Sequence, residues 1–278
     1  MSNFEAAPQI KVLALDLDGT LTNSQKIITP RTRAALDAAM DKGVTIVLAS
    51  GRPTVGVMPL AKELDLPHRG GCILSYNGGS LVDCMSGQTW YQKRLPAAMV
   101  PELCAFADKM DVAILTYDNR SIVTSRPEDP WVAKEAFINR IPTRKIEDLP
   151  GYVNYPISKM LICVDPEKMP LVEEMAQRQF NGRIDVYRSC AFFLEAVPIG
   201  VAKDAGLASL LERKGLCSKN LMAVGDGVND LSMIRYAGVG VAMKNADTIV
   251  KHGADYVTEN DNDHDGVAEA IEKFILNV

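Results

Sequence analysis

The chain has 278 residues, of which 47% are hydrophobic, and a formal net charge of −5. This length suggests two domains or one large one, and the apolar content is sufficient for the packed core of a soluble protein. Basic residues are dispersed along the chain, so the charge pattern argues against binding to nucleic acid or to an anionic membrane surface.

The sequence carries no signal for export or membrane insertion. No stretch approaches the roughly 20 apolar residues of a spanning helix, and residues 1–10 lack a basic segment followed by an apolar one. The six cysteines are widely spread without a C-x-x-C pair, which fits reduced intracellular thiols better than disulfides or a zinc site. We therefore expect a cytoplasmic protein.

The first 50 residues alternate strand and helix signals. Residues 11–15, with the apolar run 12–15, predict a buried strand. Thr29 and Pro30 are suited to the N-cap and first position of a helix that runs to about residue 42, and residues 45–49 predict a second strand. This order favours a parallel sheet with right-handed crossovers. The same pattern returns with a helix over 201–214, a strand over 221–224 and a helix beginning near Asn229.

The middle of the chain has a different character. Alternating runs predict strands at 112–117, 159–164, 185–187 and 192–196, interrupted by helices near 97–110, 131–139 and 167–180. We therefore expect an α/β fold: a Rossmann-like, doubly wound parallel-sheet core over 1–84 and 199–278, with an α+β cap domain inserted over 85–198.

The most informative motif is Asp16-Leu17-Asp18-Gly19-Thr20, at the end of the first predicted strand. Ligands of open α/β sheets bind outside the carboxyl ends of the strands, so Asp16 can present a nucleophilic oxygen there and Asp18 can act as acid and base. Gly19 allows a sharp turn behind them. The alternative is an Asp-rich turn that caps a helix.

Three further sites follow predicted strands or begin a helix. Ser50 and Gly51 follow the second strand and could hold phosphate oxygens, or simply form a strand-to-helix turn. Lys203 lies early in a helix, where a cation is disfavoured by the helix dipole. A role in neutralising a phosphoryl group would explain it, and a solvated surface lysine is the alternative.

The last site is Gly225-Asp226-Gly227-Val228-Asn229-Asp230, directly after the strand at 221–224. Mg²⁺ prefers hard oxygen ligands and usually takes one or two carboxylates together with substrate phosphate. Asp16, Asp226 and the backbone carbonyl of Asp18 could supply them. The alternative is a loop in which Asn229 or Asp230 caps the next helix.

Together and in this order, these motifs resemble the haloacid dehalogenase-like hydrolase superfamily over nearly the whole chain. The resemblance implies that Asp16 is the nucleophile and Asp18 the acid/base. It also implies roles for other residues: phosphate contacts from Ser50, Lys203, Asn229 and the Leu17 amide, and metal-site acids at Asp226 and Asp230.

A finer resemblance is to the Cof-type phosphatases with a large C2 cap, subfamily IIB. The segments that carry it are Tyr76-Asn77-Gly78-Gly79, Glu195-Ala-Val-Pro198, Gly240-Val-Ala-Met243 and Asp265-Gly-Val-Ala268. Two departures are Asp204 and Lys244, where glycine is common in such relatives. The resemblance implies Mg²⁺-dependent hydrolysis of a small phosphorylated metabolite, with sugar phosphates favoured, through an aspartyl phosphate.

Rival interpretations remain open at this point. A phosphomutase would use the same aspartyl phosphate, and a non-catalytic phosphometabolite-binding regulator would retain Lys203 and Asp226. Residues 261–272 also satisfy the spacing of an EF-hand calcium loop. An EF-hand requires a helix on both sides, however, and the entering segment is predicted to contain a short strand at 255–258.

Overall fold

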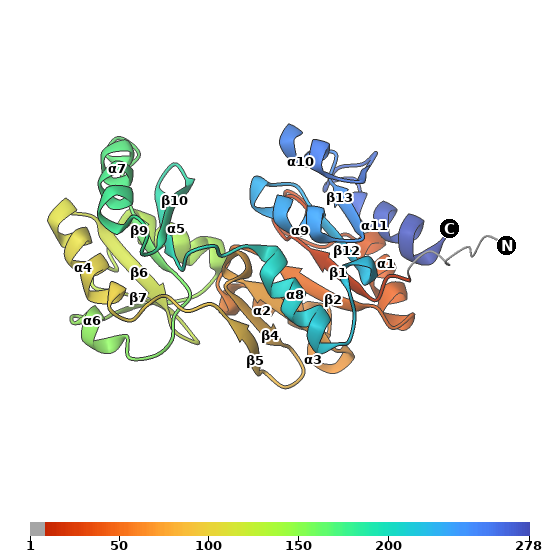
Figure 1. Ribbon diagram of the computed structural model, residues 1–278, viewed down its shortest axis with the longest axis horizontal. Coiled ribbons are helices and arrows are strands. Elements are labelled where there is room, and N and C mark those ends of the chain that lie inside the picture. Colours follow the sequence, from red (N-terminus) through yellow and green to blue (C-terminus); the bar gives the residue numbers. More distant parts are fainter. Residues whose placement is uncertain (1–8) are drawn as a thin grey trace. The chain divides into compact units, whose positions relative to one another are not determined.

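The structure of residues 9–278 is a computed structural model (Figure 1). The chain forms two compact units. We call the first the core unit, which comprises the described residues before Arg52 together with Met58–Tyr91 and Ala202–Val278. The second, called the insertion unit, comprises Arg52–Val57 and Gln92–Val201.

The core unit is built on an eight-stranded sheet with the order β14-β13-β12-β1-β2-β3-β4-β5. Its strands from β14 to β3 are parallel, and β4 runs antiparallel to β3. The strands are β1 (Val12–Leu15), β2 (Thr45–Ala49), β3 (Gly71–Ser75), β4 (Ser80–Asp83), β5 (Thr89–Gln92), β12 (Leu221–Gly225), β13 (Val239–Ala242) and β14 (Tyr256–Val257).

The register of the central strands aligns their carboxyl ends. Leu15, the last residue of β1, pairs with Val224 of β12 on one side and with Leu48 of β2 on the other. All four residues of β1 are buried, as expected for a strand covered on both faces. The residues that follow these three strands therefore emerge at the same edge of the sheet.

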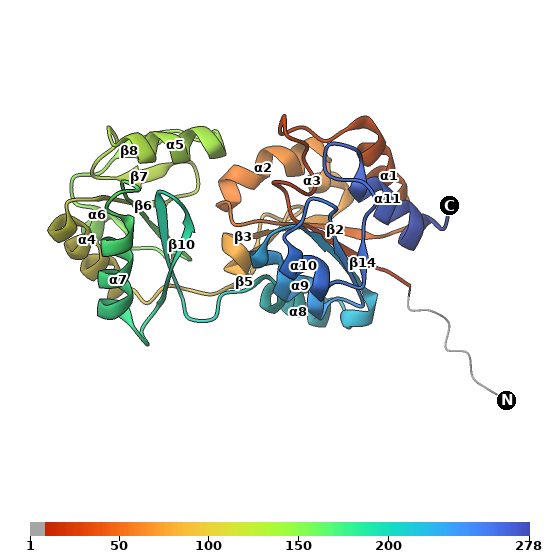
Figure 2. The same cartoon turned by 90° about the horizontal axis from the view of Figure 1, so that it is seen from above.

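Helices cover both faces of this sheet, and Figure 2 shows α1 and α11 on one side and α8 and α9 on the other. The helices are α1 (Pro30–Asp41), α2 (Thr54–Glu63), α3 (Leu66–Arg69), α8 (Lys203–Arg213), α9 (Leu231–Tyr236), α10 (Thr248–Gly253) and α11 (Gly266–Ile271), with short helical turns η1 (Tyr76–Gly78), η2 (Ser218–Asn220), η3 (Val228–Asp230) and η4 (Glu272–Leu276). Thr29 caps α1 by accepting a hydrogen bond from the Thr32 amide. The expected α/β fold class is confirmed.

The insertion unit has a six-stranded sheet with the order β10-β11-β9-β6-β7-β8, antiparallel except for the β7–β8 pair. Its strands are β6 (Ala113–Tyr117), β7 (Ile122–Thr124), β8 (Thr143–Lys145), β9 (Met160–Cys163), β10 (Asp185–Cys190) and β11 (Phe193–Val197). Its helices are α4 (Met99–Met110), α5 (Pro130–Asn139), α6 (Leu149–Tyr152) and α7 (Met169–Phe180).

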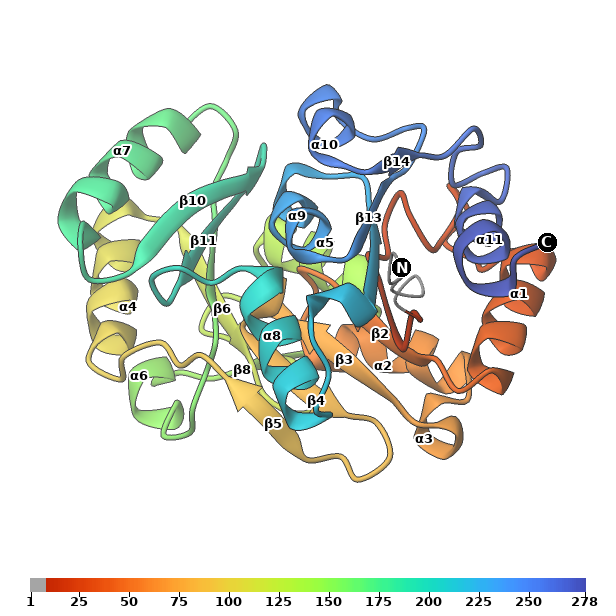
Figure 3. The same cartoon turned by 45° about the vertical axis from the view of Figure 1, so that its right-hand side comes forward.

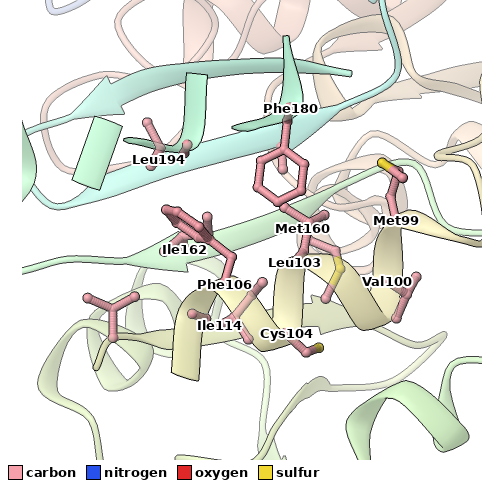
Figure 4. Close-up of a cluster of buried hydrophobic side chains, with 14 of the residues drawn as sticks. Met99, Val100, Leu103, Cys104, Phe106, Ile114, Met160, Ile162, Phe180 and Leu194 are labelled. Atoms are coloured by element: carbon pink, nitrogen blue, oxygen red, sulfur yellow. The ribbon is translucent and has the colours of Figure 1, made fainter. Parts of the chain in front are cut away.

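The insertion unit has its own hydrophobic core, between one face of its sheet and the helices α4 and α7 (Figures 3 and 4). Phe106 of α4 and Phe180 of α7 meet edge to face, with ring centroids 5.6 Å apart. Alternate strand residues such as Ile114, Ile162 and Leu194 pack against them. Each aromatic ring contributes a large apolar area, so the insertion has the packing of an independent domain.

The long segment of the insertion unit runs from Gln92 to Val201, and the predicted insertion runs from 85 to 198. At the first of these boundaries the core extends further, because β5 adds to the edge of its sheet. The assignment of the insertion as a specificity cap stays a prediction. Within residues 9–278, no helix is long and apolar enough to cross a membrane.

Candidate active site

Asp16 and Lys203 meet at the carboxyl edge of the core sheet. Asp16 follows β1, and its amide still donates to Val224 of β12 at 3.0 Å, which continues the parallel ladder by one residue. The Lys203 ammonium is fully buried and lies 2.6 Å from Asp16 Oδ1. It also donates to the carbonyl oxygen of Ala49, the last residue of β2, at 2.7 Å. Lys203 is therefore not the solvated surface lysine of the alternative interpretation.

Asp230 is the second carboxylate on this lysine, with Oδ1 2.5 Å from the ammonium. Its other oxygen accepts hydrogen bonds from the amides of Asp226 and Gly227, both at 3.0 Å. These bonds lie within the helical turn η3, which continues directly into α9 at Leu231, so a helical segment begins near Asn229 as expected. Asp230 thus links the ammonium to the backbone of the loop that carries Asp226.

Asp226 is held against the turn that follows Asp16. Its Oδ1 accepts a hydrogen bond from the Thr20 hydroxyl at 2.6 Å. Gly19 has a φ of +86°, and a Cβ there would collide with the Asp226 carboxylate. A side chain at position 19 is therefore disfavoured both by its backbone conformation and by this close approach. The supporting role of Thr20 was not assigned from the sequence, although the residue stands in the motif.

Ser50, Gly51 and Asn229 gather around Asn77. The Asn77 amide donates to the Ser50 carbonyl at 3.0 Å, and the Asn229 side chain donates to Asn77 Oδ1 at 3.1 Å. A Cβ on Gly51 would lie 3.0 Å from the same Asn77 oxygen. Asn77 itself has a positive φ of 53°. Asn77 stands in one of the segments that resemble the family, where no role was predicted for it, and in the structure it links two strand-end loops.

Asp18 stands beside a different lysine. Its Oδ1 lies 2.7 Å from the ammonium of Lys26, and both side chains are partly exposed. Leu17, between the two aspartates, is buried, and its carbonyl accepts hydrogen bonds from the amide and hydroxyl of Thr22, both at 2.9 Å. Asp18 and Asp16 therefore occupy different environments, one exposed and the other enclosed.

Burial dominates the electrostatics of the enclosed group. It raises the pKa of Asp16 to about 8, with the attraction of Lys203 opposing the shift and the repulsion of Asp230 and Asp226 adding to it. Burial likewise raises the pKa of Asp226 to about 6. For Lys203, burial lowers the pKa, but the attraction of Asp16 and Asp230 outweighs it and keeps the pKa above its ordinary value. Lys203 therefore stays charged in spite of its burial.

The three carboxylates can serve as a site for a divalent cation. One oxygen each of Asp16, Asp226 and Asp230 lies within 4.8 Å of the others. Three carboxylates against one ammonium leave an excess of negative charge in a poorly solvated place, which is costly unless a cation or a proton offsets it. The donors are hard oxygens, the type that suits Mg²⁺, so the residues present fit that ion.

The acidic segment at 261–266 does not have the surroundings of an EF-hand. It follows the strand β14 and a loop, and only α11 after it is helical. The Asp263 carboxylate accepts bonds from Ser24, and Asp265 accepts from the hydroxyl of Thr29. These acids are engaged with the loop after β1, so the calcium interpretation is not supported.

Comparison with known proteins agrees with this geometry. Residues 13–271 match the family model of the haloacid dehalogenase-like hydrolases. The chain is 31% identical over 274 residues to the 5-amino-6-(5-phospho-D-ribitylamino)uracil phosphatase YcsE of Bacillus subtilis, covering 96% of each protein.

Two solved structures show the same similarity in three dimensions. A haloacid dehalogenase-like hydrolase from Bacteroides thetaiotaomicron is 47% identical, with a TM-score of 0.92 over 95% of this chain and 99% of that one. The subclass IIB sugar phosphatase BT4131 is 28% identical, with a TM-score of 0.77 over 95% of this chain and 98% of that one. The chain belongs to the haloacid dehalogenase-like hydrolases and, within them, to the Cof-type phosphatases.

Proposed function

We propose that this phosphatase is Mg²⁺-dependent and hydrolyses small phosphorylated metabolites, sugar phosphates above all, through a phosphate ester on Asp16. The observation that carries the proposal is the contact of a buried ammonium, Lys203, with Asp16 at 2.6 Å in a cluster of carboxylates. A buried carboxylate oriented by a cation and set beside a cation site is suited to attack on a phosphate.

Asp16 and Asp226 would hold the metal through carboxylate oxygens, together with the Asp18 backbone carbonyl. Asp230 would add negative charge behind them, since its oxygens already accept from Lys203 and from the loop amides. When bound, the ion would offset the repulsion between Asp16 and a phosphate dianion.

In the first step, an Asp16 oxygen attacks phosphorus, the bond from phosphorus to the leaving oxygen breaks, and Asp18 gives that oxygen a proton. In the second step, Asp18 takes a proton from water, which attacks phosphorus and releases inorganic phosphate and the free Asp16 carboxylate. Lys203, the Ser50 hydroxyl, the Asn229 side chain and the amides of Leu17 and Gly51 would contact the phosphate oxygens in both steps.

Two relatives support a phosphate on a sugar or sugar alcohol as the substrate. BT4131 is named as a sugar phosphatase. YcsE is named for a substrate that carries its phosphate on a ribityl chain. We further propose that the insertion selects the leaving group. A chimera with the insertion of a relative of different specificity should adopt that relative's order of substrate preference, and an unchanged order would contradict this role.

The direct test is a rapid-quench experiment with a sugar phosphate carrying radioactive phosphorus. Label should appear transiently on the peptide that contains Asp16 and then pass to inorganic phosphate. Transfer of the label to a second hydroxyl of the sugar would identify a phosphomutase. The absence of labelled protein, despite turnover, would contradict a covalent step.

A further inference from the structure

A second lysine, Lys26, contacts one of the two proposed catalytic aspartates, Asp18. The Lys26 ammonium lies 2.7 Å from Asp18 Oδ1, and the exposed fractions of the two side chains are 51% and 38%. An ion pair this exposed contributes little to stability, so its effect on the folding free energy does not explain why it forms at Asp18.

Lys26 is held by a tightly bonded turn. Asn23 Oδ1 accepts hydrogen bonds from the amides of Gln25 and Ile27, at 3.0 and 3.1 Å. The Asn23 amide donates to the Ile27 carbonyl at 3.0 Å, and the Lys26 amide donates to the Asn23 carbonyl at 2.8 Å.

The backbone of Lys26 adopts an unfavourable conformation within this turn. Its φ is 62°, in the left-handed region that is unfavourable for a residue with a Cβ. Glycine would avoid this cost, but it could not carry an ammonium to Asp18. The turn therefore retains a lysine where its backbone alone would favour glycine.

The acidic segment near the C-terminus anchors the same turn. Asp263 accepts one hydrogen bond from the Ser24 amide and another from the Ser24 hydroxyl, both at 2.7 Å. The Asn262 side chain donates to the Thr22 carbonyl at 3.0 Å. The carboxylate whose spacing suggested calcium binding thus binds the backbone two residues from Lys26.

We propose that Lys26 is a positioning residue for Asp18, and that Asp263 braces the turn that carries it. The proposal rests on the proposed function, in which Asp18 donates a proton to the leaving oxygen. Proton transfer needs a heavy-atom separation of about 2.6–3.2 Å, and a partly exposed carboxylate can rotate out of that range. The ammonium on Oδ1 restricts this rotation, because turning the carboxylate would break a charge-assisted hydrogen bond.

The test compares two phosphate esters with Lys26→Met. An alkyl phosphate such as β-glycerol phosphate has a poor leaving group that needs the proton, whereas p-nitrophenyl phosphate releases a stable phenolate that does not. The ratio kcat/KM reports the steps up to the first irreversible one, so it excludes the later attack by water. We expect kcat/KM to fall about tenfold for the alkyl ester, a part of the usual 10²–10⁴ of general acid catalysis, and less than about twofold for the aryl ester.

Three further variants separate positioning from a merely structural role. Lys26→Arg should restore most of the alkyl-ester activity, since it retains a cation. Asp263→Asn should show a smaller loss of kcat/KM, again larger for the alkyl ester than for the aryl ester. In the double variant with Lys26→Met, the two losses should not add. Gln25→Met, in the same turn, is the control and should match the wild type. Inhibition by inorganic phosphate should stay unchanged in all four variants.

An equal loss on both esters, or an unchanged alkyl-ester rate in Lys26→Met, would overturn the positioning role. So would a loss that only accompanies a lower melting temperature. If the wild-type enzyme hydrolyses neither ester with Mg²⁺ nor any other phosphate monoester, the proposed function itself fails, and that result is distinct from either outcome for Lys26.

Discussion

Each unit contains a buried lysine paired with a carboxylate, and the two sites differ in how crowded they are. In the core unit, Lys203 has carboxylate oxygens of Asp16 and Asp230 at 2.6 and 2.5 Å. In the insertion unit, Lys159, directly before β9, lies 3.4 Å from Glu195 of β11. Both ammonium groups are almost fully enclosed.

The surplus of carboxylates in the core site is what distinguishes it. A single pair can be neutral as a whole, whereas Asp16, Asp226 and Asp230 together exceed the charge of Lys203. Burial raises the pKa of Asp16 to about 8, and the repulsion of Asp230 and Asp226 adds to this shift. Such repulsion destabilises the fold unless a ligand offsets it, which is the pattern expected of a functional site. The comparison therefore predicts opposite effects for removing an acid and removing the lysine from the core cluster.

The largest expected effect is on the activity of Asp16→Asn. The amide is not a nucleophile, so kcat should fall by about 10³-fold or more. Stability should not fall, because the variant keeps the pair of Lys203 with Asp230 and loses a repelling carboxylate. Phosphate release and thermal melting would measure the two effects, with the exposed Asp108→Asn as the control. An active variant would contradict the role of Asp16 as nucleophile, and a less stable one would contradict repulsion among the carboxylates of the core cluster.

Lys203→Met should destabilise the core unit. It leaves Asp16 and Asp230 buried without their shared cation, and breaking a buried pair in this way costs about 3–5 kcal/mol. Activity should also fall severely. Hydrogen exchange in β1 and β12 would measure the local loss, and the double variant with Asp230→Asn should recover part of the stability. No recovery in the double variant would show that repulsion between the acids is not the cause.

Bound Mg²⁺ should offset the repulsion among the three carboxylates of the core cluster in the wild-type enzyme. Ligand at 100 times its dissociation constant adds about 2.7 kcal/mol to stability, so Mg²⁺ should raise the melting temperature. Asp226→Asn should reduce this rise, while Asp108→Asn should not. Chelation should remove activity, which Mg²⁺ restores and Ca²⁺ restores poorly, since the larger ion accepts more ligands. An unchanged melting temperature with Mg²⁺ would contradict the cation site.

Much of the core could be predicted because its signals are local. Apolar runs that end in Asp16, Ser50 and Gly225 indicated parallel strands, and the rule for strand ends then placed their polar residues on one edge. The structure brings Asp16, Asp226, Asp230 and Lys203 together there. Their catalytic and metal-binding roles stay predictions.

The features that escaped prediction depend on long-range contacts. Lys26 adopts a left-handed backbone without being a glycine, and the distant Asp263 adds two hydrogen bonds to its turn. The Asn229 side chain likewise donates to Asn77, which is 152 residues away in the chain. Local patterns do not record such bonds, so the roles of Lys26 and Asn77 could not be derived from them.

The smallest expected effect concerns the second lysine. Lys159→Met removes an ammonium at 3.4 Å from Glu195, and that carboxylate still accepts a hydrogen bond from the Tyr187 hydroxyl at 3.2 Å. Glu195 keeps this donor and, within residues 9–278, belongs to no group of three acids close enough to share a metal ion, so the loss should be about 1–2 kcal/mol, below that of Lys203→Met.

Hydrogen exchange in β9 and β11 gives the relevant measurement for Lys159→Met, because a two-unit protein need not unfold in one step. Glu195→Gln should cost a similar amount, and the double variant should cost less than the two losses combined, since both remove the same ion pair. Protection in β1 should stay at the wild-type level in each variant. If Lys159→Met costs as much as Lys203→Met, crowding by carboxylates does not set the two lysines apart.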